Sequence, residues 1–160
     1  AKKNGWRTVF WSEAPLLDGS WDVLIIDALG ILGKLYGLAQ VVFMGGSLIP
    51  HGGQNPVEAA VFRCAILHGP HVHNFAEVYQ QLNASGAALQ VGHAGELEEK
   101  IRSLIADPDA ANSMGKSAYR LVQQWTGASK RHLDWLLEHY GSRERMENGK
   151  PSEELFSPSR

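Results

Sequence analysis

The sequence predicts an α/β protein in which a doubly wound parallel sheet carries helices on both faces, with further helices towards the C-terminus. Short apolar runs of strand length alternate with segments whose apolar residues recur at helical spacing. Most of these runs are continuously apolar, which is typical of strands buried on both faces. Because the connections are short, the alternation favours parallel strands joined by crossover helices.

Five strands and three intervening helices are expected before the C-terminal helices. The runs that indicate strands are residues 8–11, 23–26, 41–44, 65–67 and 88–91. Helical spacing is shown by Leu32, Leu35, Tyr36 and Ala39, by Phe75, Val78, Tyr79 and Leu82, and by Leu97, Ile101, Leu104 and Ile105. Asn74 stands just before the second of these helices and is expected to be its N-cap.

Two amphipathic helices are expected to follow. Their apolar stripes are Met114, Ala118, Leu121, Val122 and Trp125, and, beyond a break at Thr126 and Gly127, Leu133, Leu136, Leu137 and Tyr140. These stripes indicate packing faces. Residues 141–160 are rich in Gly, Pro, Ser and charge, which is typical of disorder. The sequence therefore predicts a folded domain over residues 1–140 and a disordered polar tail over residues 141–160.

Length and composition exclude several classes of protein. The 160 residues fit one globular domain, and the single cysteine excludes an intramolecular disulfide framework. With 15 Lys and Arg against 17 Asp and Glu, the net charge of −2 argues against a nucleic-acid partner. No run approaches the roughly 18 apolar residues of a membrane span, so the chain is expected to be soluble. It begins with Ala1 rather than Met, as expected of a fragment or a processed product.

The segment that points most clearly to chemistry is VVFMGGSLIPHGGQNPVEAAVF, residues 41–62. A buried strand runs directly into Gly45, Gly46 and Ser47, a second glycine pair follows, and residues 55–58 open a helix. Glycines let backbone N–H groups approach a ligand with no Cβ in the way, and a helix N-terminus favours anions. Ligands of open α/β sheets also bind beyond the carboxyl ends of strands. The pattern indicates a nucleotide or anion site, although it matches neither the P-loop nor GxGxxG.

The same residues have a purely structural interpretation. Asn55 as N-cap, Pro56 at the first helical position and Glu58 three residues after the cap form a capping box, whose cap alone is worth about 1 kcal/mol. The two roles are compatible, because a carboxylate at the third helical position can also accept hydrogen bonds from a ribose diol. Local sequence leaves both interpretations open.

Four histidines nearby invite a metal interpretation, but their spacing does not support it. His51, His68, His71 and His73 lack a carboxylate or thiolate at metal-ligand spacing, so neither a metal site nor a cofactor is expected. His51 and His71 are expected at the rim of the ligand site, because their loops should border it. Cys64 precedes an apolar run and is expected to be a buried small residue.

Four motifs in a fixed order give a more specific indication. They are Asp27-Ala28-Leu29-Gly30, the turn Gly45-Gly46-Ser47, the segment His51-Gly52-Gly53-Gln54-Asn55-Pro56-Val57-Glu58, and Gly69-Pro70-His71 with Asn74-Phe75. Over residues 22–91 the chain closely resembles the C-terminal half of the 3-deoxy-D-manno-octulosonic acid (Kdo) transferases, and the helical remainder resembles it loosely. The resemblance implies a GT-B fold, in which two Rossmann-like domains face each other across a cleft. The C-terminal domain holds the nucleotide of the donor, CMP-Kdo.

The resemblance also implies an activity for the full-length protein. These glycosyltransferases move Kdo onto a lipid A precursor in lipopolysaccharide biosynthesis, at the cytoplasmic face of the bacterial inner membrane, by an inverting and metal-independent transfer. Their catalytic carboxylate lies in an N-terminal domain that is absent from this chain. The resemblance therefore implies that the acceptor binds through that domain, that membrane contact is peripheral, and that this chain holds no catalytic residue and is inactive alone.

Carried over position by position, the resemblance implies a set of nucleotide-binding residues. They are Leu29, Gly30, Ile31, Gly46, Ser47, Asn55, Pro56, Val57 and Glu58. Glu58 is the expected ribose ligand, and Gly46 and Ser47 are expected near the phosphate. The family usually reads Asp-Thr-x-Gly-Glu where this chain has Ala28 and Ile31, so side-chain hydrogen bonds from those two positions are lost.

Two other interpretations remain open at the level of sequence. The chain could be the C-terminal half of another GT-B enzyme, such as a UDP-sugar transferase or an epimerase. It could also be a non-catalytic nucleotide-binding module that keeps the fold without turnover. Titration with CMP, UMP and UDP separates these interpretations, because each predicts a different preferred nucleotide or none.

Overall fold

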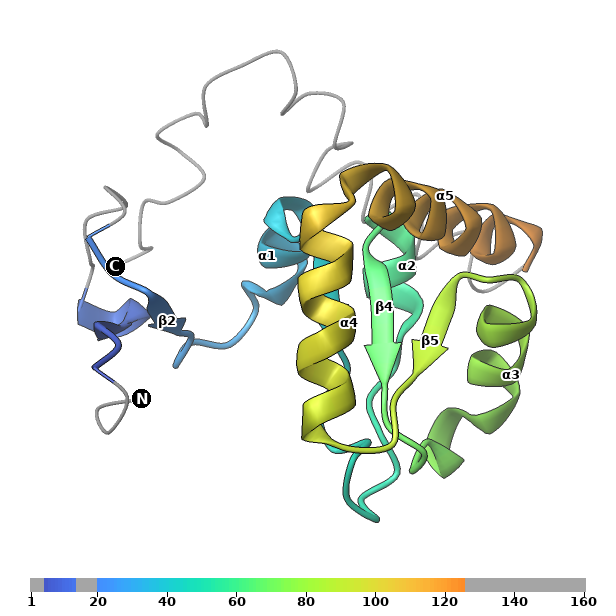
Figure 1. Cartoon of the computed structure of the whole chain (residues 1–160), viewed down its shortest axis with the longest axis horizontal. Helices are drawn as coiled ribbons and strands as arrows, with labels where there is room; N and C mark the ends of the chain where they lie inside the picture. Colours follow the sequence, from blue (N-terminus) through green and yellow to red (C-terminus); the bar gives the residue numbers. More distant parts are fainter. Residues whose placement is uncertain (1–4, 14–19, 126–160) are drawn as a thin grey trace. The chain divides into compact units, whose positions relative to one another are not determined.

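The computed structural model describes residues 5–13 and 20–125, which are drawn in colour in Figure 1. The chain divides into two compact units, residues 1–32 with 150–160 and residues 33–149, and each is described by itself. The expected helix around Leu133 and the expected tail over residues 141–160 lie outside the described residues.

The first unit contains a pair of short parallel strands. They are β1 (Thr8–Phe10), which leads into the 3-10 turn η2 (Trp11–Glu13), and β2 (Val23–Ile25), with Thr8 opposite Val23. The backbone N–H of Arg7 donates to the Asp22 carboxylate at 2.8 Å. This hydrogen bond is the main reason that the pKa of Asp22 lies below its usual range, and the nearby guanidinium adds to the effect.

The second unit is built from three parallel strands and the helices around them. Its strands are β3 (Val41–Phe43), β4 (Ala65–His68) and β5 (Ala88–Gln90), paired in the order β3-β4-β5. Its helices are α1 (Leu32–Leu38), α2 (Val57–Val61), the 3-10 turn η3 (His73–Phe75), α3 (Ala76–Ala84), α4 (Ala94–Ala106) and α5 (Pro108–Gln124). The α/β class and the parallel strands are confirmed, although the described strands form two sheets rather than one.

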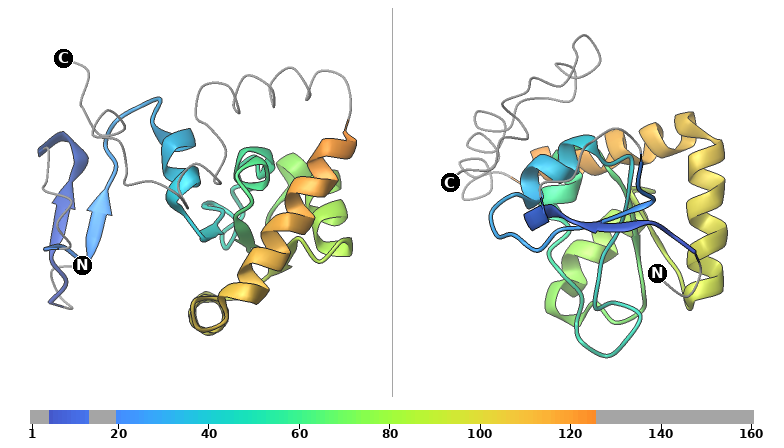
Figure 2. Two further views of the ribbon diagram at one scale, coloured as in Figure 1. Left: turned by 90° about the horizontal axis from the view of Figure 1, so that it is seen from above. Right: turned by 90° about the vertical axis from the view of Figure 1, so that its left-hand side faces the viewer.

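β4 is the central strand of the larger sheet, and all four of its residues are buried. Successive side chains of a strand point to opposite faces, and they join two separate apolar clusters. Ile66 packs with residues of α1, α2 and α3, whereas Ala65 and Leu67 pack with α4. Figure 2 shows the strands lying between α3 and α4. The continuous apolar run in the sequence reflects this burial on both faces.

α5 closes the amino edge of this sheet and contributes to both clusters. Its first half supplies Ala111 to the α4 side, and its second half supplies Ala118 and Val122 to the other side. Gly115 lies so close to Arg63, the residue two positions before β4, that a Cβ at Gly115 would overlap the Arg63 carbonyl. The small residue therefore lets the helix backbone meet the backbone at the amino edge of the sheet.

Two details of the helices differ from the sequence expectation. Asn74 does not cap α3, because it lies inside η3 and α3 follows Phe75. Ile105, expected on the apolar stripe of α4, is 61% exposed, so only the other members of that stripe face the core. None of the helices in the described part of the chain has the length and apolar content needed to span a bilayer.

Candidate functional site

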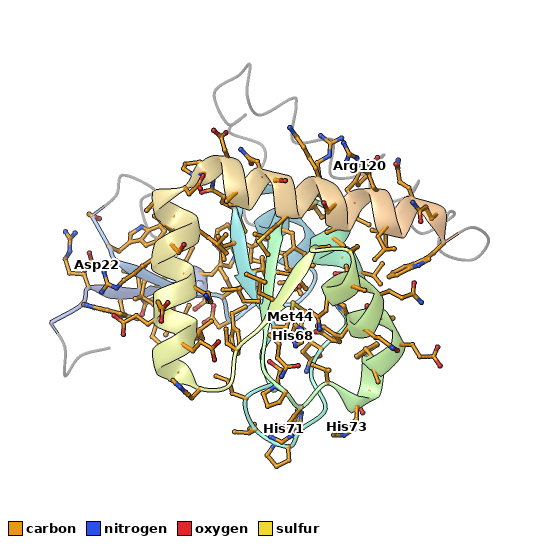
Figure 3. The ribbon with its side chains drawn as sticks, turned by 45° about the vertical axis from the view of Figure 1, so that its right-hand side comes forward. Asp22, Met44, His68, His71, His73 and Arg120 are labelled. Atoms are coloured by element: carbon orange, nitrogen blue, oxygen red, sulfur yellow. The ribbon has the colours of Figure 1, made fainter. Side chains whose placement is uncertain are left out.

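Two loops leave the carboxyl ends of neighbouring strands and meet at one end of the second unit. The first follows β3 and is called the glycine loop, residues 44–56; the second follows β4 and is called the histidine loop, residues 69–75. Figure 1 shows the loops beyond the tip of the β4 arrow, and Figure 3 shows His71 and His73 at this end, opposite Arg120 of α5. The carboxyl ends of parallel strands are the usual place for a ligand in such sheets.

The glycine loop turns through backbone conformations that favour glycine. Gly46 has φ +70°, Gly52 has φ +102° and Gly53 has φ +72°. The backbone N–H of Gly53 donates to the carbonyl of Gly46 at 3.3 Å, which closes the loop on itself. The ring of His51 packs against Gly46, where an added Cβ would lie 3.0 Å from the His51 Cδ2. Geometry thus explains the glycines at positions 46, 52 and 53.

Backbone and hydroxyl groups join the glycine loop to the histidine loop. The buried Ser47 hydroxyl accepts from the Gly69 N–H at 2.8 Å and donates to the Met44 carbonyl. The His71 N–H donates to the Ser47 carbonyl at 2.9 Å. Ser47 therefore fixes the contact between the loops, and its side chain is fully buried beneath them.

Asn74 provides a second link between the same loops. Its backbone N–H donates to the Gly52 carbonyl at 3.2 Å. A Cβ at Gly52 would overlap the Asn74 side-chain amide, so that amide packs directly on the glycine backbone. The polar residue that the sequence marks as a helix cap is instead used to hold the glycine loop.

The short helix α2 begins where the glycine loop ends, and the Asn55 side chain bonds its first N–H. The Asn55 Oδ1 accepts from the Val57 N–H at 3.0 Å, and Pro56 is buried and already helical with φ −85° and ψ −7°. Regular helical bonding starts at Val57, one residue later than expected, and helix ends commonly differ by this much. The Asn55 side chain thus bonds the start of α2, but Pro56 rather than Asn55 holds the N-cap position, so the expected capping box is displaced by one residue.

Glu58 lies in the first turn of α2 and is half-buried. It is close enough to the buried Tyr36 that its charge adds to the effect of burial, the main cause, in raising the pKa of the Tyr36 hydroxyl. Glu58 therefore sits at the boundary between the core of the second unit and the surface formed by the loops.

The predicted site residues fall into two groups in the structure. Gly46, Ser47 and the segment from Asn55 to Glu58 come together at the carboxyl edge of the larger sheet. Leu29, Gly30 and Ile31 lie between β2 and α1, in the first unit. Gly30 has φ +81°, which its residue type permits.

The histidines have different surroundings. His68 is fully buried, His51 is exposed, and His71 is half-buried in the histidine loop. Among the residues that the structure describes, no group of three or more His, Cys, Asp and Glu side chains could hold a metal ion. Cys64 is buried, as expected, with its thiol directed at the Tyr36 and Ala39 carbonyls.

Sequence reasoning missed the contacts of three residues, two of them in this region and one in the first unit. Tyr79 looks like an apolar helix residue, yet its hydroxyl donates to the Gln54 carbonyl of the glycine loop at 2.7 Å. Asp27, part of the first motif, accepts from the Ser12 hydroxyl and the Ser12 N–H, and these bonds lower the pKa of Asp27. The third is Asn74. Their partners lie at least 15 residues away along the chain, so no local pattern could identify them.

Comparison with curated proteins finds 3-deoxy-D-manno-octulosonic acid transferases among the relatives of this chain. The 3-deoxy-D-manno-octulosonic acid transferase of Haemophilus influenzae is 31% identical over 140 residues, which cover 87% of this chain and 33% of the relative. The enzyme of the same name from Bordetella pertussis is 34% identical over 120 residues, covering 75% of this chain and 28% of the relative. The chain spans about a third of the length of these relatives. No protein-family model matches it.

The comparison with solved structures agrees with the comparison with curated proteins. The crystal structure of the C-terminal CMP-Kdo binding domain of WaaA from Acinetobacter baumannii matches with a TM-score of 0.72 and 28% identity, over 76% of this chain and 64% of that one. The relatives indicate the family, and the solved structure indicates the domain. The chain belongs to the 3-deoxy-D-manno-octulosonic acid transferase family and represents its C-terminal domain, the Rossmann-like half of a GT-B glycosyltransferase.

Proposed function

We propose that this chain is the donor-nucleotide-binding domain of a Kdo transferase and holds the CMP part of CMP-Kdo. The observation that carries the proposal is the glycine loop, which leaves β3 with positive φ at Gly46, Gly52 and Gly53 and delivers a capped helix start at the carboxyl edge of the sheet. The solved relative with this fold, described as a CMP-Kdo binding domain, supports the same ligand.

The roles within the site follow from chemistry. Glu58 accepts hydrogen bonds from the ribose hydroxyls, while Gly46 leaves the backbone of the glycine loop open to the phosphate. Ser47 acts through its backbone and through the loop contact, because its hydroxyl is already hydrogen-bonded within the protein. The remaining contacts within the second unit come from Asn55, Pro56 and Val57. Leu29, Gly30 and Ile31 stay predictions from the family resemblance.

In the whole protein the bound nucleotide serves the transfer of Kdo to a lipid A precursor in lipopolysaccharide biosynthesis. Binding energy from the CMP part, which does not react, orients the sugar for attack by the acceptor hydroxyl. The acceptor site, the catalytic carboxylate and a peripheral contact with the cytoplasmic face of the inner membrane belong to an N-terminal domain. The chain alone is then a binding domain without turnover.

Calorimetric titration of the chain with CMP, UMP and UDP tests the proposal. We expect CMP to bind more tightly than the other two nucleotides, and the substitution Glu58→Gln to weaken CMP binding by about tenfold, the usual worth of hydrogen bonds to a charged group. Glutamine has nearly the size and the helix propensity of glutamate, so this variant removes the carboxylate charge and keeps the helix start.

The matched control is Glu77→Gln, which removes an exposed carboxylate from the first turn of α3. It should leave both CMP affinity and thermal stability unchanged. A chain that binds UDP as well as CMP would contradict the assignment of the donor. A Glu58→Gln variant with lowered stability and unchanged CMP affinity would mean that the carboxylate only supports the helix.

A further inference from the structure

Two aromatic side chains are buried directly beneath the loops of the candidate site. His68, the last residue of β4, is 0% exposed, and Tyr79, in α3, is 1% exposed. Their ring centroids lie 4.5 Å apart at an interplanar angle of 49°. Figure 3 shows His68 in the interior, on the side of the sheet that leads to His71. The nucleotide contacts proposed above use neither ring.

The Tyr79 hydroxyl reaches the glycine loop from below. It lies 2.7 Å from the Gln54 carbonyl oxygen, which can only accept, so the hydroxyl donates. Burial raises the pKa of Tyr79, with a smaller contribution from Tyr36, so the donor proton is retained. This bond holds the residue just before Asn55, where the loop becomes a helix.

His68 supports the Tyr79 ring and also belongs to a hydrogen-bonded chain. Its Nδ1 lies 2.7 Å from the Gly69 carbonyl and therefore carries the proton. Its Nε2 lies 3.0 Å from the Asn83 side-chain oxygen Oδ1. Gly69 is the first residue of the histidine loop, and its N–H donates to the Ser47 hydroxyl. His68 therefore contacts the histidine loop through Gly69, just as Tyr79 contacts the glycine loop through Gln54.

We propose that Tyr79, supported by His68, is a positioning residue for nucleotide binding, whose hydroxyl fixes the Gln54 carbonyl and with it the start of α2. The inference rests on the proposed function and adds a residue that touches no ligand. Glycine-rich backbone loses the most conformational entropy on ordering, so a loop with Gly52 and Gly53 depends on outside bonds to stay in one conformation. A preordered loop binds its ligand without bearing that entropy loss at the moment of binding.

The test is Tyr79→Phe, which keeps the ring in the core and removes only the hydroxyl. Its control is Tyr119→Phe, which removes a hydroxyl from α5 that accepts from the Gln123 amide at 2.8 Å, far from both loops in sequence. CMP affinity is measured by calorimetry. Hydrogen exchange of residues 53–57 is measured without ligand, because loop order is a property of the free protein.

For Tyr79→Phe we expect CMP binding about three- to tenfold weaker, the size of one lost hydrogen bond, and faster exchange over residues 53–57. Tyr119→Phe should change neither quantity. Unchanged affinity together with unchanged exchange in a folded Tyr79→Phe variant would overturn the inference. If the wild-type chain binds no CMP, the proposed function fails, and the exchange data still decide whether Tyr79 orders the loop.

A second variant covers the case in which Tyr79→Phe does not fold. Asn83→Ala acts from an exposed position of α3 and removes the partner of His68 Nε2 without touching the apolar core. We expect it to speed exchange over residues 53–57 by a smaller factor than the loss of the hydroxyl. Exchange over these residues identical to that of the wild type would contradict the support that His68 is said to give.

Discussion

The two edges of the larger sheet are built by different means. At the amino edge, α5 lies against the backbone of Arg63 through Gly115, and the buried side chains there are apolar. At the carboxyl edge, hydrogen bonds of Ser47 and Asn74 join the glycine loop to the histidine loop, and the Tyr79 hydroxyl binds the glycine loop from α3. Figure 3 shows the two edges at opposite ends, marked by Arg120 and by His71 with His73.

This difference separates stability from binding. The stabilisation that comes from apolar contacts and close packing is roughly proportional to the buried area, and it does not depend on a ligand. Hydrogen-bonded glycine turns contribute little net stability but fix where N–H groups point. The amino edge is therefore expected to determine how stable the unit is, and the carboxyl edge what it binds. Loops that carry function on a rigid scaffold follow the same division.

The largest expected effect tests the amino edge. Gly115→Ala places a Cβ inside the Arg63 carbonyl, and backbone cannot move aside as a flexible side chain can. We expect a loss of about 3 kcal/mol in the free energy of unfolding, at the upper end of overpacking effects. Urea denaturation followed by circular dichroism measures it. CMP affinity of the fraction that remains folded should be unchanged.

The control is Gly95→Ala in α4, where a Cβ would meet only the His93 ring, at 3.3 Å. Glycine disfavours a helix relative to alanine by up to about 1 kcal/mol, so this variant should be neutral or stabilising. Equal losses from the two substitutions would mean that the contact with Arg63 is not what limits the amino edge.

The next effect tests the carboxyl edge and should appear in binding rather than in unfolding. Gly52→Ala meets two obstacles: a φ of +102°, and the Asn74 amide that packs on the glycine. The loop must change shape, so we expect CMP affinity to fall about tenfold or more, with a loss of only about 1–2 kcal/mol in stability. Calorimetry and urea denaturation on the same preparation give both numbers.

Gly45→Ala is the matched control within the same loop. A Cβ at Gly45 would have no atom within 4 Å, and the residue is not among those with positive φ. Both affinity and stability should stay close to wild type. A Gly52→Ala variant that lost stability without losing CMP affinity would show that the carboxyl edge carries stability after all.

Much of the scaffold could be predicted because it depends on local patterns. Burial on both faces makes β4 a continuous apolar run, and helical spacing marks α4 and α5. The bond between Asn55 and the start of α2 could be predicted because its partner, Val57, is only two residues away. Such features need no knowledge of distant contacts.

The parts that could not be predicted depend on distant partners. Asn74 has the residue type of a helix cap, but packing against Gly52, 22 positions earlier, wins over the local preference. Tyr79 fits an apolar stripe, and nothing nearby shows that its hydroxyl pairs with Gln54, 25 positions earlier. The candidate site could be located from its glycines and its motif, whereas the bonds that shape it could not.

The smallest effects compare one helix cap at each edge. α5 starts at the amino edge, where Asp107 Oδ1 accepts from the Ala110 N–H at 3.0 Å. α4 starts at the carboxyl edge, where His93 Nδ1 accepts from the Glu96 N–H at 3.2 Å. A carboxylate also interacts favourably with the positive end of the helix dipole, which a neutral imidazole does not.

Asp107→Ala is therefore expected to lower the free energy of unfolding by about 1 kcal/mol, and His93→Ala by about 0.5 kcal/mol. Urea denaturation at pH 8 measures both, and repeating it in 1 M NaCl should shrink the Asp107 effect more, because salt screens the dipole interaction. A larger loss from His93→Ala would break the comparison, since the carboxyl edge would then contribute more to stability than the edge that α5 closes.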